Sequence, residues 1–164
     1  MKIRGILLLV VLLPFLGACD QPSSEQAATL FDGDWIAFSH PGDWKVTRQA
    51  QGERQAIRLE GPADAYLAIT ILPADAADDL EAFAQALPRD HPEARLMLAD
   101  RPAHTGRLHG YRETLQLQGR QVQREYHQVT RNDETAYLVS EVTAAQAVQA
   151  QPGFDLVFTT FRFK

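Results

Sequence analysis

The stretch GYRETLQLQGRQVQREYHQVTRNDETAYLVSEVT, residues 110–143, decides the fold. Two turn signals, Gln118-Gly119 and Asn132-Asp133, divide it into three segments of strand length. Short polar or glycine-containing turns between such segments are typical of β-hairpins. The stretch therefore predicts three antiparallel strands that follow one another as a meander.

Charged residues in this meander suggest a register for the three strands. With the turn at Gln118-Gly119, the facing pairs are Arg112 with Glu125, Glu113 with Arg124, Leu115 with Val122 and Tyr111 with Tyr126. With the turn at Asn132-Asp133, Arg124 also faces Glu141, which makes a row Glu113–Arg124–Glu141 across the strands. Such a row could orient a ligand. We expect instead a solvated charge ladder that contributes a few tenths of a kcal/mol per pair.

Upstream of the meander, the apolar pattern predicts further strands. Residues 35–40 and 44–47 are joined by the turn Pro41-Gly42-Asp43, and residues 55–60 alternate polar and apolar side chains. Residues 66–72 are more continuously apolar, which favours a place in the interior of the sheet. Together with the meander these segments predict an α+β domain dominated by antiparallel strands.

One helix is expected just after Asp78. Asp78 and Glu81 have the spacing of a capping box, and Pro88 ends the segment. The apolar residues of this helix recur on one face and predict a stripe against the sheet: Leu80, Phe83, Ala84 and Leu87. A cation site is the alternative for its acidic residues, Asp75, Asp78, Asp79 and Glu81, but their spacing matches no calcium loop and helix capping explains them.

A second helix is expected near the C-terminus. Pro152 suits the first helical position, and an apolar stripe follows at helical spacing: Phe154, Val157, Phe158 and Phe161. Residues 157–161 could also form a strand. We favour the helix, with its aromatic stripe packed on the sheet.

Two motifs resemble a known family. Residues 38–46, FSHPGDWKV, resemble the F-x-x-P-x-x-W-x-V opening of the PsbP-like domain, and residues 154–161, FDLVFTTF, resemble its closing helix. The resemblance covers roughly residues 34–163 and, among relatives, is greatest to DcrB-type bacterial lipoproteins. It implies an antiparallel sheet flanked by helices and a binding or assembly role without catalysis. It supplies no catalytic residue, and Pro41 and Trp44 match a turn that specifies the fold; Trp44 lining a binding surface is the alternative.

The N-terminus resembles a bacterial lipoprotein signal peptide. Residues 1–18 contain Lys2 and Arg4, an apolar run too short to span a bilayer, and a small-residue cleavage site before Cys19. Cys19 is the single cysteine of the chain, so no disulfide can form within it, and lipid attachment at Cys19 explains the lone thiol. Asp20 resembles a sorting signal for retention at the inner membrane. An uncleaved anchor helix and a non-lipidated secretory peptide are the alternatives.

These features divide the chain into a signal peptide (1–18), an acylated cysteine with a flexible tether (19–30) and a PsbP-like domain (31–164). Beyond residue 18, 14 basic residues stand against 21 acidic ones, a formal charge of −7. Such a domain repels nucleic acid, and acyl chains rather than a basic patch would hold it to the membrane.

Catalytic and metal-binding motifs are missing from the sequence. It has no G-x-S-x-G elbow, no H-E-x-x-H pair and no phosphate-binding loop. Five histidines are present, without ligand spacing: His40, His91, His104, His109 and His127. A zinc site from His104, His109 and His127 would require one ring to be turned to the other face of the sheet. We therefore expect neither a catalytic residue nor a metal or other cofactor.

The sequence thus predicts a lipid-anchored module on the periplasmic face of the cell membrane that binds or assembles an envelope protein. The alternative is a carrier of a small amphipathic ligand or lipid between sheet and helices, which requires a hollow interface there. A hydrolase would require polar groups that converge in a cleft.

Overall fold

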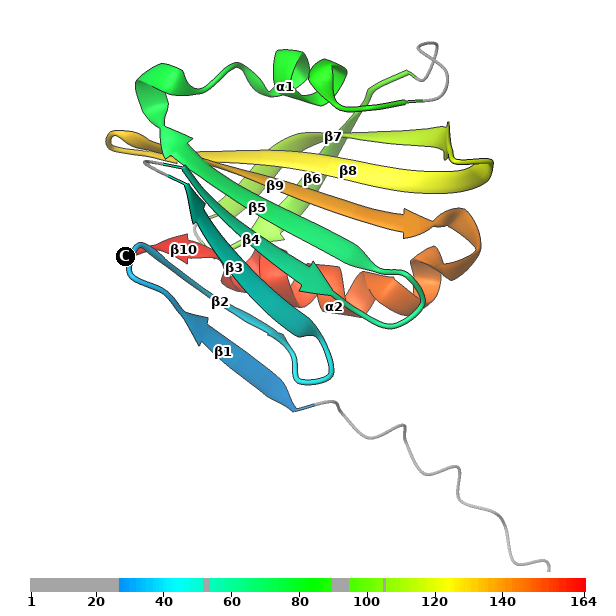
Figure 1. Cartoon of the computed structure of the whole chain (residues 1–164), viewed down its shortest axis with the longest axis horizontal. Coiled ribbons are helices and arrows are strands. Elements are labelled where there is room, and N and C mark those ends of the chain that lie inside the picture. Colours follow the sequence, from blue (N-terminus) through cyan, green and yellow to red (C-terminus); the bar gives the residue numbers. More distant parts are fainter. Residues whose placement is uncertain (1–26, 52–53, 90–94, 105) are drawn as a thin grey trace, which may run out of the picture.

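The computed structural model describes residues 27–51, 54–89, 95–104 and 106–164. They form two antiparallel sheets and two α-helices (Figure 1). The expected α+β class, an antiparallel sheet flanked by helices, is confirmed. Within the described residues, no helix combines the length and the apolar character needed to cross a membrane. Residues 1–18, Cys19 and Asp20 lie outside the described part of the chain.

The larger sheet has seven strands in the order β3-β4-β5-β9-β8-β7-β6. Their bounds are β3 (Lys45–Gln51), β4 (Arg54–Glu60), β5 (Tyr66–Pro73), β6 (Met97–Ala103), β7 (Gly106–Leu117), β8 (Arg120–Arg131) and β9 (Glu134–Thr143). All neighbouring strands are antiparallel. The apolar strand β5 lies inside the sheet, as its composition predicts.

The smaller sheet has the order β1-β2-β10 and is formed by β1 (Ala28–Asp32), β2 (Ile36–Pro41) and β10 (Arg162–Phe163). The turn after β2, closed by a hydrogen bond from Trp44 N to the Pro41 carbonyl (3.1 Å), carries the chain into the larger sheet. The expected tether boundary is wrong at its C-terminal end, because residues 28–30 pair with β2 as part of β1. Apolar contact explains this pairing, since Phe31 stacks on Phe38 with ring centroids 4.7 Å apart.

The predicted register of the meander is confirmed at every proposed pair. Tyr111 faces Tyr126, Arg112 faces Glu125, and Glu113 faces Arg124, which in turn faces Glu141. Gln118 and Gly119 both have positive φ (52° and 75°), as a two-residue hairpin loop with a primed turn requires. Turn chemistry and facing charges therefore sufficed to align three strands.

Helix α1 (Leu80–Ala86) begins one residue later than expected. Its N-cap is Asp79 rather than Asp78: the Asp79 carboxylate accepts a hydrogen bond from Ala82 N at 2.8 Å. The Asp78 carbonyl instead accepts the Tyr137 hydroxyl. The predicted stripe faces the sheet, where Phe83 stacks on Tyr137 with ring centroids 3.9 Å apart.

Helix α2 (Ala147–Thr160) begins five residues before the expected position, and Pro152 lies inside it. The Ala/Gln-rich segment before Pro152 has high helix propensity and extends the helix upstream. Proline at this position removes the helical hydrogen bond to the Val148 carbonyl, and Val148 is among the most exposed apolar residues described. Water can therefore satisfy that carbonyl.

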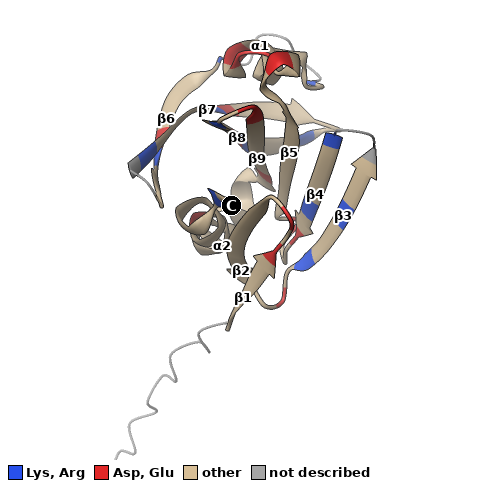
Figure 2. Ribbon diagram, turned by 90° about the vertical axis from the view of Figure 1, so that its left-hand side faces the viewer, with Lys and Arg blue, Asp and Glu red and all other residues tan. Residues whose placement is uncertain are grey.

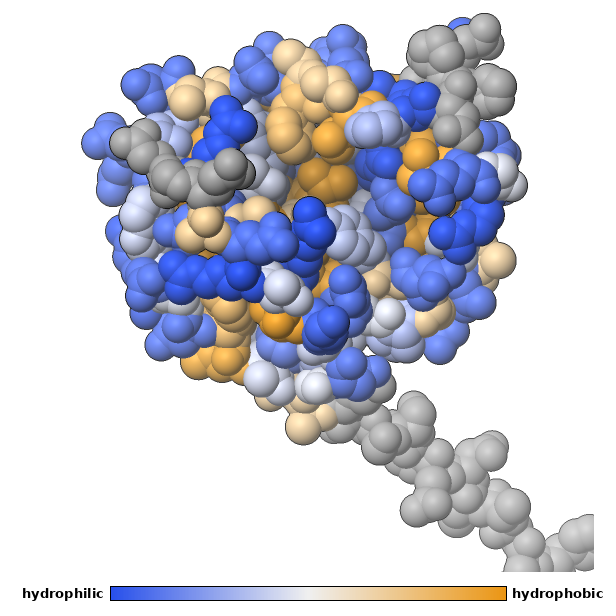
Figure 3. All heavy atoms as spheres, in the orientation of Figure 1, coloured by the Kyte–Doolittle hydropathy of each residue, from blue (hydrophilic) through white to orange (hydrophobic). Residues whose placement is uncertain are grey.

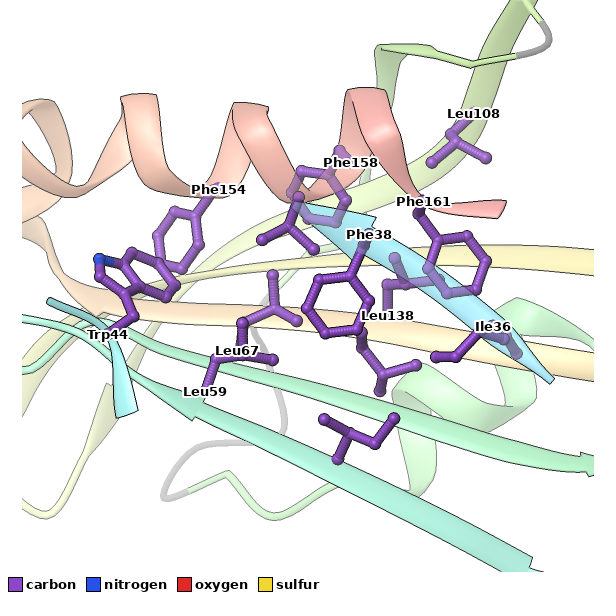
Figure 4. Close-up of a cluster of buried hydrophobic side chains, with 14 of the residues drawn as sticks. Ile36, Phe38, Trp44, Leu59, Leu67, Leu108, Leu138, Phe154, Phe158 and Phe161 are labelled. Carbon is purple, nitrogen blue, oxygen red and sulfur yellow. The ribbon is translucent and has the colours of Figure 1, made fainter. Parts of the chain in front are cut away.

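The larger sheet curves around α2, and α1 lies on the opposite, convex side (Figure 2). Between the concave face, α2 and β2 lies the main core, in which Trp44 meets Phe154 edge-on at 5.4 Å (Figure 4). A Cβ atom at Gly61 or Gly153 would lie 2.5 or 2.3 Å from the Trp44 indole, so both positions require glycine. Trp44 is 5% exposed, which confirms its structural role over a place on a binding surface.

Candidate functional site

The middle of strand β8 is polar on both faces of the sheet, although it lies in the interior. Arg124 and Tyr126 point to the convex face, Glu125 and His127 point to the concave face, and all four are buried. Burying charged groups is costly unless each is paired and hydrogen-bonded. The partners on the two faces therefore show what each group does.

On the convex face, the row Glu113–Arg124–Glu141 forms as predicted, but it is not the solvated ladder we expected. Arg124 donates two hydrogen bonds to Glu141 (2.6 and 2.8 Å). Glu113 accepts hydrogen bonds from Arg89 Nε (2.9 Å) and from the Tyr126 hydroxyl. Glu113 is fully buried because α1 and the residues after it cover the row. Burial, together with the hydrogen bond to Glu113, raises the pKa of Tyr126 to about 12.

This convex cluster holds the end of α1 on the sheet. Arg89 donates to the Ala84 carbonyl (2.8 Å) and the Gln85 carbonyl (3.1 Å), and Arg124 donates to the Pro88 carbonyl (3.1 Å). These carbonyls lie at the C-terminal end of α1, where helices leave acceptors without partners. The convex cluster is thus explained by the attachment of α1.

On the concave face, Glu125 is the common acceptor of three cationic or hydrogen-bonding side chains. Its carboxylate accepts hydrogen bonds from Arg101 Nε (2.5 Å) and Nη2 (2.8 Å), from Arg112 Nε (3.0 Å) and from His127 Nε2 (2.7 Å). Burial alone would raise its pKa, but the hydrogen bonds from Arg101 and His127 outweigh burial and hold the pKa of Glu125 well below its usual range. Glu125 is therefore a fixed anion.

Arg101 connects this network to helix α2. Its Nη1 donates to Asp155 at 2.8 Å, and its guanidinium lies 5.9 Å from the centre of the Phe158 ring. Gln151, one turn earlier on α2, also donates to Asp155 at 2.8 Å. A single arginine thus ties β6, β8 and α2 together.

His127 completes the network from the core side. Because Glu125 is an anion and accepts at this contact, the proton lies on Nε2. The ring also packs against Phe158 at 4.9 Å, and its Nδ1 has no partner among the described atoms. A Cβ atom at Gly110 would lie 2.4 Å from Nδ1 and 2.1 Å from the Tyr126 carbonyl oxygen, so only glycine fits opposite His127.

The hypothetical zinc ligands are not brought together. His109 is exposed and bonds Asp100 at 2.9 Å, on the face opposite His127, and His104 is exposed on the turn after β6. His40 donates from Nδ1 to the Pro41 carbonyl at 2.8 Å, and His91 lies outside the described residues. In the described ranges, no three His, Cys, Asp or Glu side chains are grouped as a metal site would require.

A pocket of about 50 Å³ opens beside the Glu125 network, between α2 and strands β7 to β9. The polar residues that line it are Arg101, Arg112, Gln123, Arg124, Glu125, Ser140 and Gln151, and Val142 and Phe154 complete the lining. Ser140 is buried, and no hydrogen bond joins its hydroxyl to another described residue. Drug-sized ligands occupy about 300–1,000 Å³. The pocket therefore suits a few waters or one small polar group, such as a single side chain of a partner.

The strand register places the pocket on a row that runs across the sheet. Ser140 faces Glu125, Glu125 faces Arg112, and Arg112 faces Met97 on strand β6. Strand β6 is an edge of the sheet. The row that lines the pocket therefore leads to this edge.

The chemistry of these groups favours binding. Glu125 accepts several hydrogen bonds at once, and no described base lies within hydrogen-bond distance of the Ser140 hydroxyl to activate it. Arg112 contacts Glu125 through Nε (3.0 Å) and Nη2 (2.9 Å). No hydrogen bond joins its Nη1 to a described residue. Nη1 of Arg112 and the Ser140 hydroxyl thus remain for an occupant.

Sequence reasoning missed most of this site. It paired Arg112 with Glu125 but gave no role to Arg101, Asp155, Ser140 or Gln151, which reach the site from other strands and from α2. One signal was present: residues 124–127 read Arg-Glu-Tyr-His in the middle of a strand assigned to the sheet interior. A polar run at such a place indicates partners on both faces.

No protein-family model matches the sequence, and no curated protein matches it. Solved structures do show similarity. The solution structure of cyanobacterial PsbP (CyanoP) from Synechocystis sp. PCC 6803 has a TM-score of 0.55 at 12% identity, over 91% of this chain and 99% of that one.

Two crystal structures are similar to a lesser degree. LpqN, involved in cell envelope biogenesis of Mycobacterium tuberculosis, has a TM-score of 0.51 at 10% identity, over 84% of this chain and 91% of that one. A Bacteroides thetaiotaomicron VPI-5482 protein has a TM-score of 0.51 at 12% identity, over 79% of this chain and 45% of that one, so the chain spans less than half of its length. At these identities the likeness establishes the fold, which is PsbP-like.

Proposed function

We propose that the protein is a lipid-anchored binding module of the bacterial cell envelope, of the DcrB type and without catalytic activity. The observation that carries this proposal is the concave-face site, in which the charged side chains pair with one another beside a small pocket lined by polar and apolar residues. Such a site offers a fixed surface for recognition. Among the described residues, no base lies within hydrogen-bond distance of the Ser140 hydroxyl to activate it.

The fold supports an envelope role. LpqN, which has a similar fold, is a protein of cell envelope biogenesis in another bacterium. The PsbP-like architecture therefore occurs in envelope proteins, and the lipoprotein-type N-terminus of this chain is consistent with the same compartment.

The anchor is proposed at Cys19, with Asp20 directing retention on the periplasmic face of the inner membrane. The segment from Asp20 to Ala27 would then connect the lipid to β1, with a typical reach of about 15 Å for a flexible chain of this length. The domain would work close to the bilayer surface.

A lipid carrier is less well supported. The interface between α2 and the larger sheet is filled by buried side chains, among them Phe154, Val157 and Phe158 (Figure 4). A carrier requires a hollow at this interface. The pocket that does open there is small and has a mixed polar and apolar lining, so we assign it to a side chain or another small group of a partner.

Fractionation of cells that express the full chain tests the anchor. Wild-type protein should stay with membranes after a salt wash, and Cys19→Ser should be released into the soluble fraction. Mass spectrometry of the N-terminal peptide should find acyl chains on Cys19 in the wild type. A Cys19→Ser protein that remains with membranes after the wash would contradict lipid anchoring.

Photo-crosslinking tests the binding site in the same cells. A photoreactive residue at Gln123, which lines the pocket, should form one discrete adduct with an envelope protein. The same residue at Gln49, exposed on the opposite edge strand β3, is the matched control and should form none. Equal adducts at both positions, or none at Gln123, would count against a partner-binding role for the concave face.

A further inference from the structure

Strand β6 leaves one edge of the larger sheet open. It pairs with β7 alone, and no backbone hydrogen bond joins its other edge to any described residue. Pro102 lacks an N–H, which is tolerated where that group would point away from the neighbouring strand. Backbone N–H groups alternate between the two edges of a strand, and Leu98 and Asp100 lie four and two residues before Pro102. Their N–H groups therefore point to the open edge. The edge that can pair with another strand therefore ends at Asp100.

The open part of this edge carries apolar side chains. Leu98 is 85% exposed and Met97 is 56% exposed, and the two side chains lie on opposite faces of the sheet. Open edges are usually protected by charged residues, prolines or covering segments. Pro102 protects the far end of β6, and Arg101 connects that end to α2. Among the described residues, the Met97–Leu98 end has neither a proline nor such a connection.

Positive charge surrounds this edge in an otherwise acidic chain. Residues 95–112 contain four arginines and one aspartate, whereas the whole chain carries a net charge of −5. Arg101 is used inside the network. Arg107, which lies 3.8 Å from Asp100, and Arg112, which shares Glu125 with Arg101, nevertheless remain 68% and 45% exposed. Arg112 faces Met97 across the strands and has Nη1 free of described partners.

We propose that the β6 edge, from Arg95 to Asp100, accepts an extended acidic segment of a partner protein as an additional strand of the sheet. Backbone hydrogen bonds to Leu98 and Asp100 hold the segment, Met97 and Leu98 contact its apolar side chains on the two faces, and Arg112 binds a carboxylate. The proposal rests on the binding role proposed above and names the surface and the kind of partner. It also connects the open edge to the pocket, because Met97, Arg112, Glu125 and Ser140 form one row.

A protein segment suits this edge better than a lipid surface does. The chain enters the described structure at the β1 side of the molecule, and the Met97 end of β6 lies away from it (Figures 1 and 2). A lipid anchor attached through residues 19–27 would bring β1 toward the bilayer. The Met97 end of β6 would then lie on the side of the domain away from the bilayer.

Binding of a defined peptide tests the proposal. The probe is a short labelled peptide in which valine and glutamate alternate, added to the full chain held in phosphatidylcholine nanodiscs. We expect binding and slower hydrogen exchange at the amides of Leu98 and Asp100. A peptide with lysine in place of glutamate should bind at least about tenfold more weakly, and one with N-methylated backbone amides should not bind.

Two matched variants locate the site. Leu98→Asp should weaken peptide binding at least about tenfold, because it removes the apolar contact and adds a negative charge. Val148→Asp makes the same change in charge at another exposed apolar residue, on α2, and should leave binding unchanged. The proposal is overturned if Leu98→Asp and Val148→Asp bind alike, if the lysine peptide binds as well, or if no binding occurs up to about 1 mM.

Other occupants of the edge would also overturn it. Vesicles of phosphatidylglycerol and phosphatidylethanolamine that bind wild-type protein but not Leu98→Asp would assign the edge to lipid. A dimer that forms in the wild type and is lost in Leu98→Asp would assign it to a second copy of the chain. If the Gln123 adduct persists while the peptide fails, the binding role stands and only the edge proposal is wrong.

Discussion

The two halves of the larger sheet present opposite kinds of side chain to the core. On the concave face, β4 and β5 present Ile57, Leu59, Leu67 and Ile69 to the core, whereas β8 presents Glu125 and His127 to the same layer. Apolar burial stabilises the first half at roughly 25 cal/mol per Å². The second half gains little net stability from its ion pairs, since desolvation offsets their attraction.

This difference locates function within the fold. A buried ion network fixes the geometry of its members but stabilises less than apolar side chains of the same volume would. The apolar half is therefore the scaffold, and the polar half holds the pocket and the open edge. The following predictions test this division, from the largest expected effect to the smallest.

Removing Trp44 should cause the largest loss of stability. Trp44→Ala deletes a buried ring that packs on Phe154 and is enclosed by Gly61 and Gly153, so we expect a loss of about 3–5 kcal/mol. Chemical denaturation of the full chain measures it. Trp35→Ala is the matched control, because Trp35 is 40% exposed, and it should cost less than about 1 kcal/mol. Equal losses would show that the apolar half is not the scaffold.

Breaking the ion network around Glu125 should cause the second-largest loss of stability. Glu125→Gln leaves Arg101 and Arg112 without their shared anion, and Arg101 is largely buried, so we expect a loss of about 3 kcal/mol. Glu60→Gln removes an exposed carboxylate that lies 3.7 Å from Lys45 and should cost less than about 0.5 kcal/mol. If the two variants unfold at the same denaturant concentration, Glu125 is not the centre of the buried network.

The contrast between the halves also explains what the sequence could predict. The register of β7, β8 and β9 follows from two turns and a few facing charges, because residues close in sequence decide it. The structural role of Trp44 and the positions of the apolar strands were also predictable, because short local motifs indicate them. The burial of the Glu113–Arg124–Glu141 row was not, because α1 covers it from a distant part of the chain.

The concave site was hidden for a related reason. Arg101 reaches Glu125 and Asp155 across 24 and 54 residues of sequence, and no local pattern indicates such contacts. The two errors at helix termini are smaller: Asp79 and Asp78 are equally good caps by residue type, and Pro152 is tolerated inside α2 because the carbonyl it leaves free lies on an exposed residue. Local chemistry thus predicted the scaffold, and tertiary contacts decide the site.

Acid should destabilise the polar half through Glu125. Its pKa is lowered in the folded state, so its contribution to stability is complete above the unfolded pKa of about 4.3 and is lost as the pH falls toward the folded pKa. Below about pH 4 the wild type should therefore lose roughly 1 kcal/mol per pH unit more than Glu125→Gln does.

Free energies of unfolding of both proteins between pH 6 and pH 3 measure this difference. The other acidic residues are common to both and cancel in the comparison. Parallel curves for the two proteins would mean that Glu125 is not held as an anion by its arginines.

The smallest effect is expected at Ser140, where the comparison reaches the pocket itself. Its hydroxyl lines the pocket and has no hydrogen bond to a described residue, so Ser140→Ala should change the free energy of unfolding by less than about 0.5 kcal/mol. Thr135 lies on the same strand and is equally buried, but its hydroxyl bonds Thr130 at 3.0 Å, so Thr135→Val should cost about 1 kcal/mol. A loss at Ser140 as large as that at Thr135 would give the hydroxyl a structural role. A negligible loss combined with a weaker Gln123 adduct would instead mean that Ser140 contacts the occupant of the pocket, because the substitution would then change binding without changing the stability of the fold.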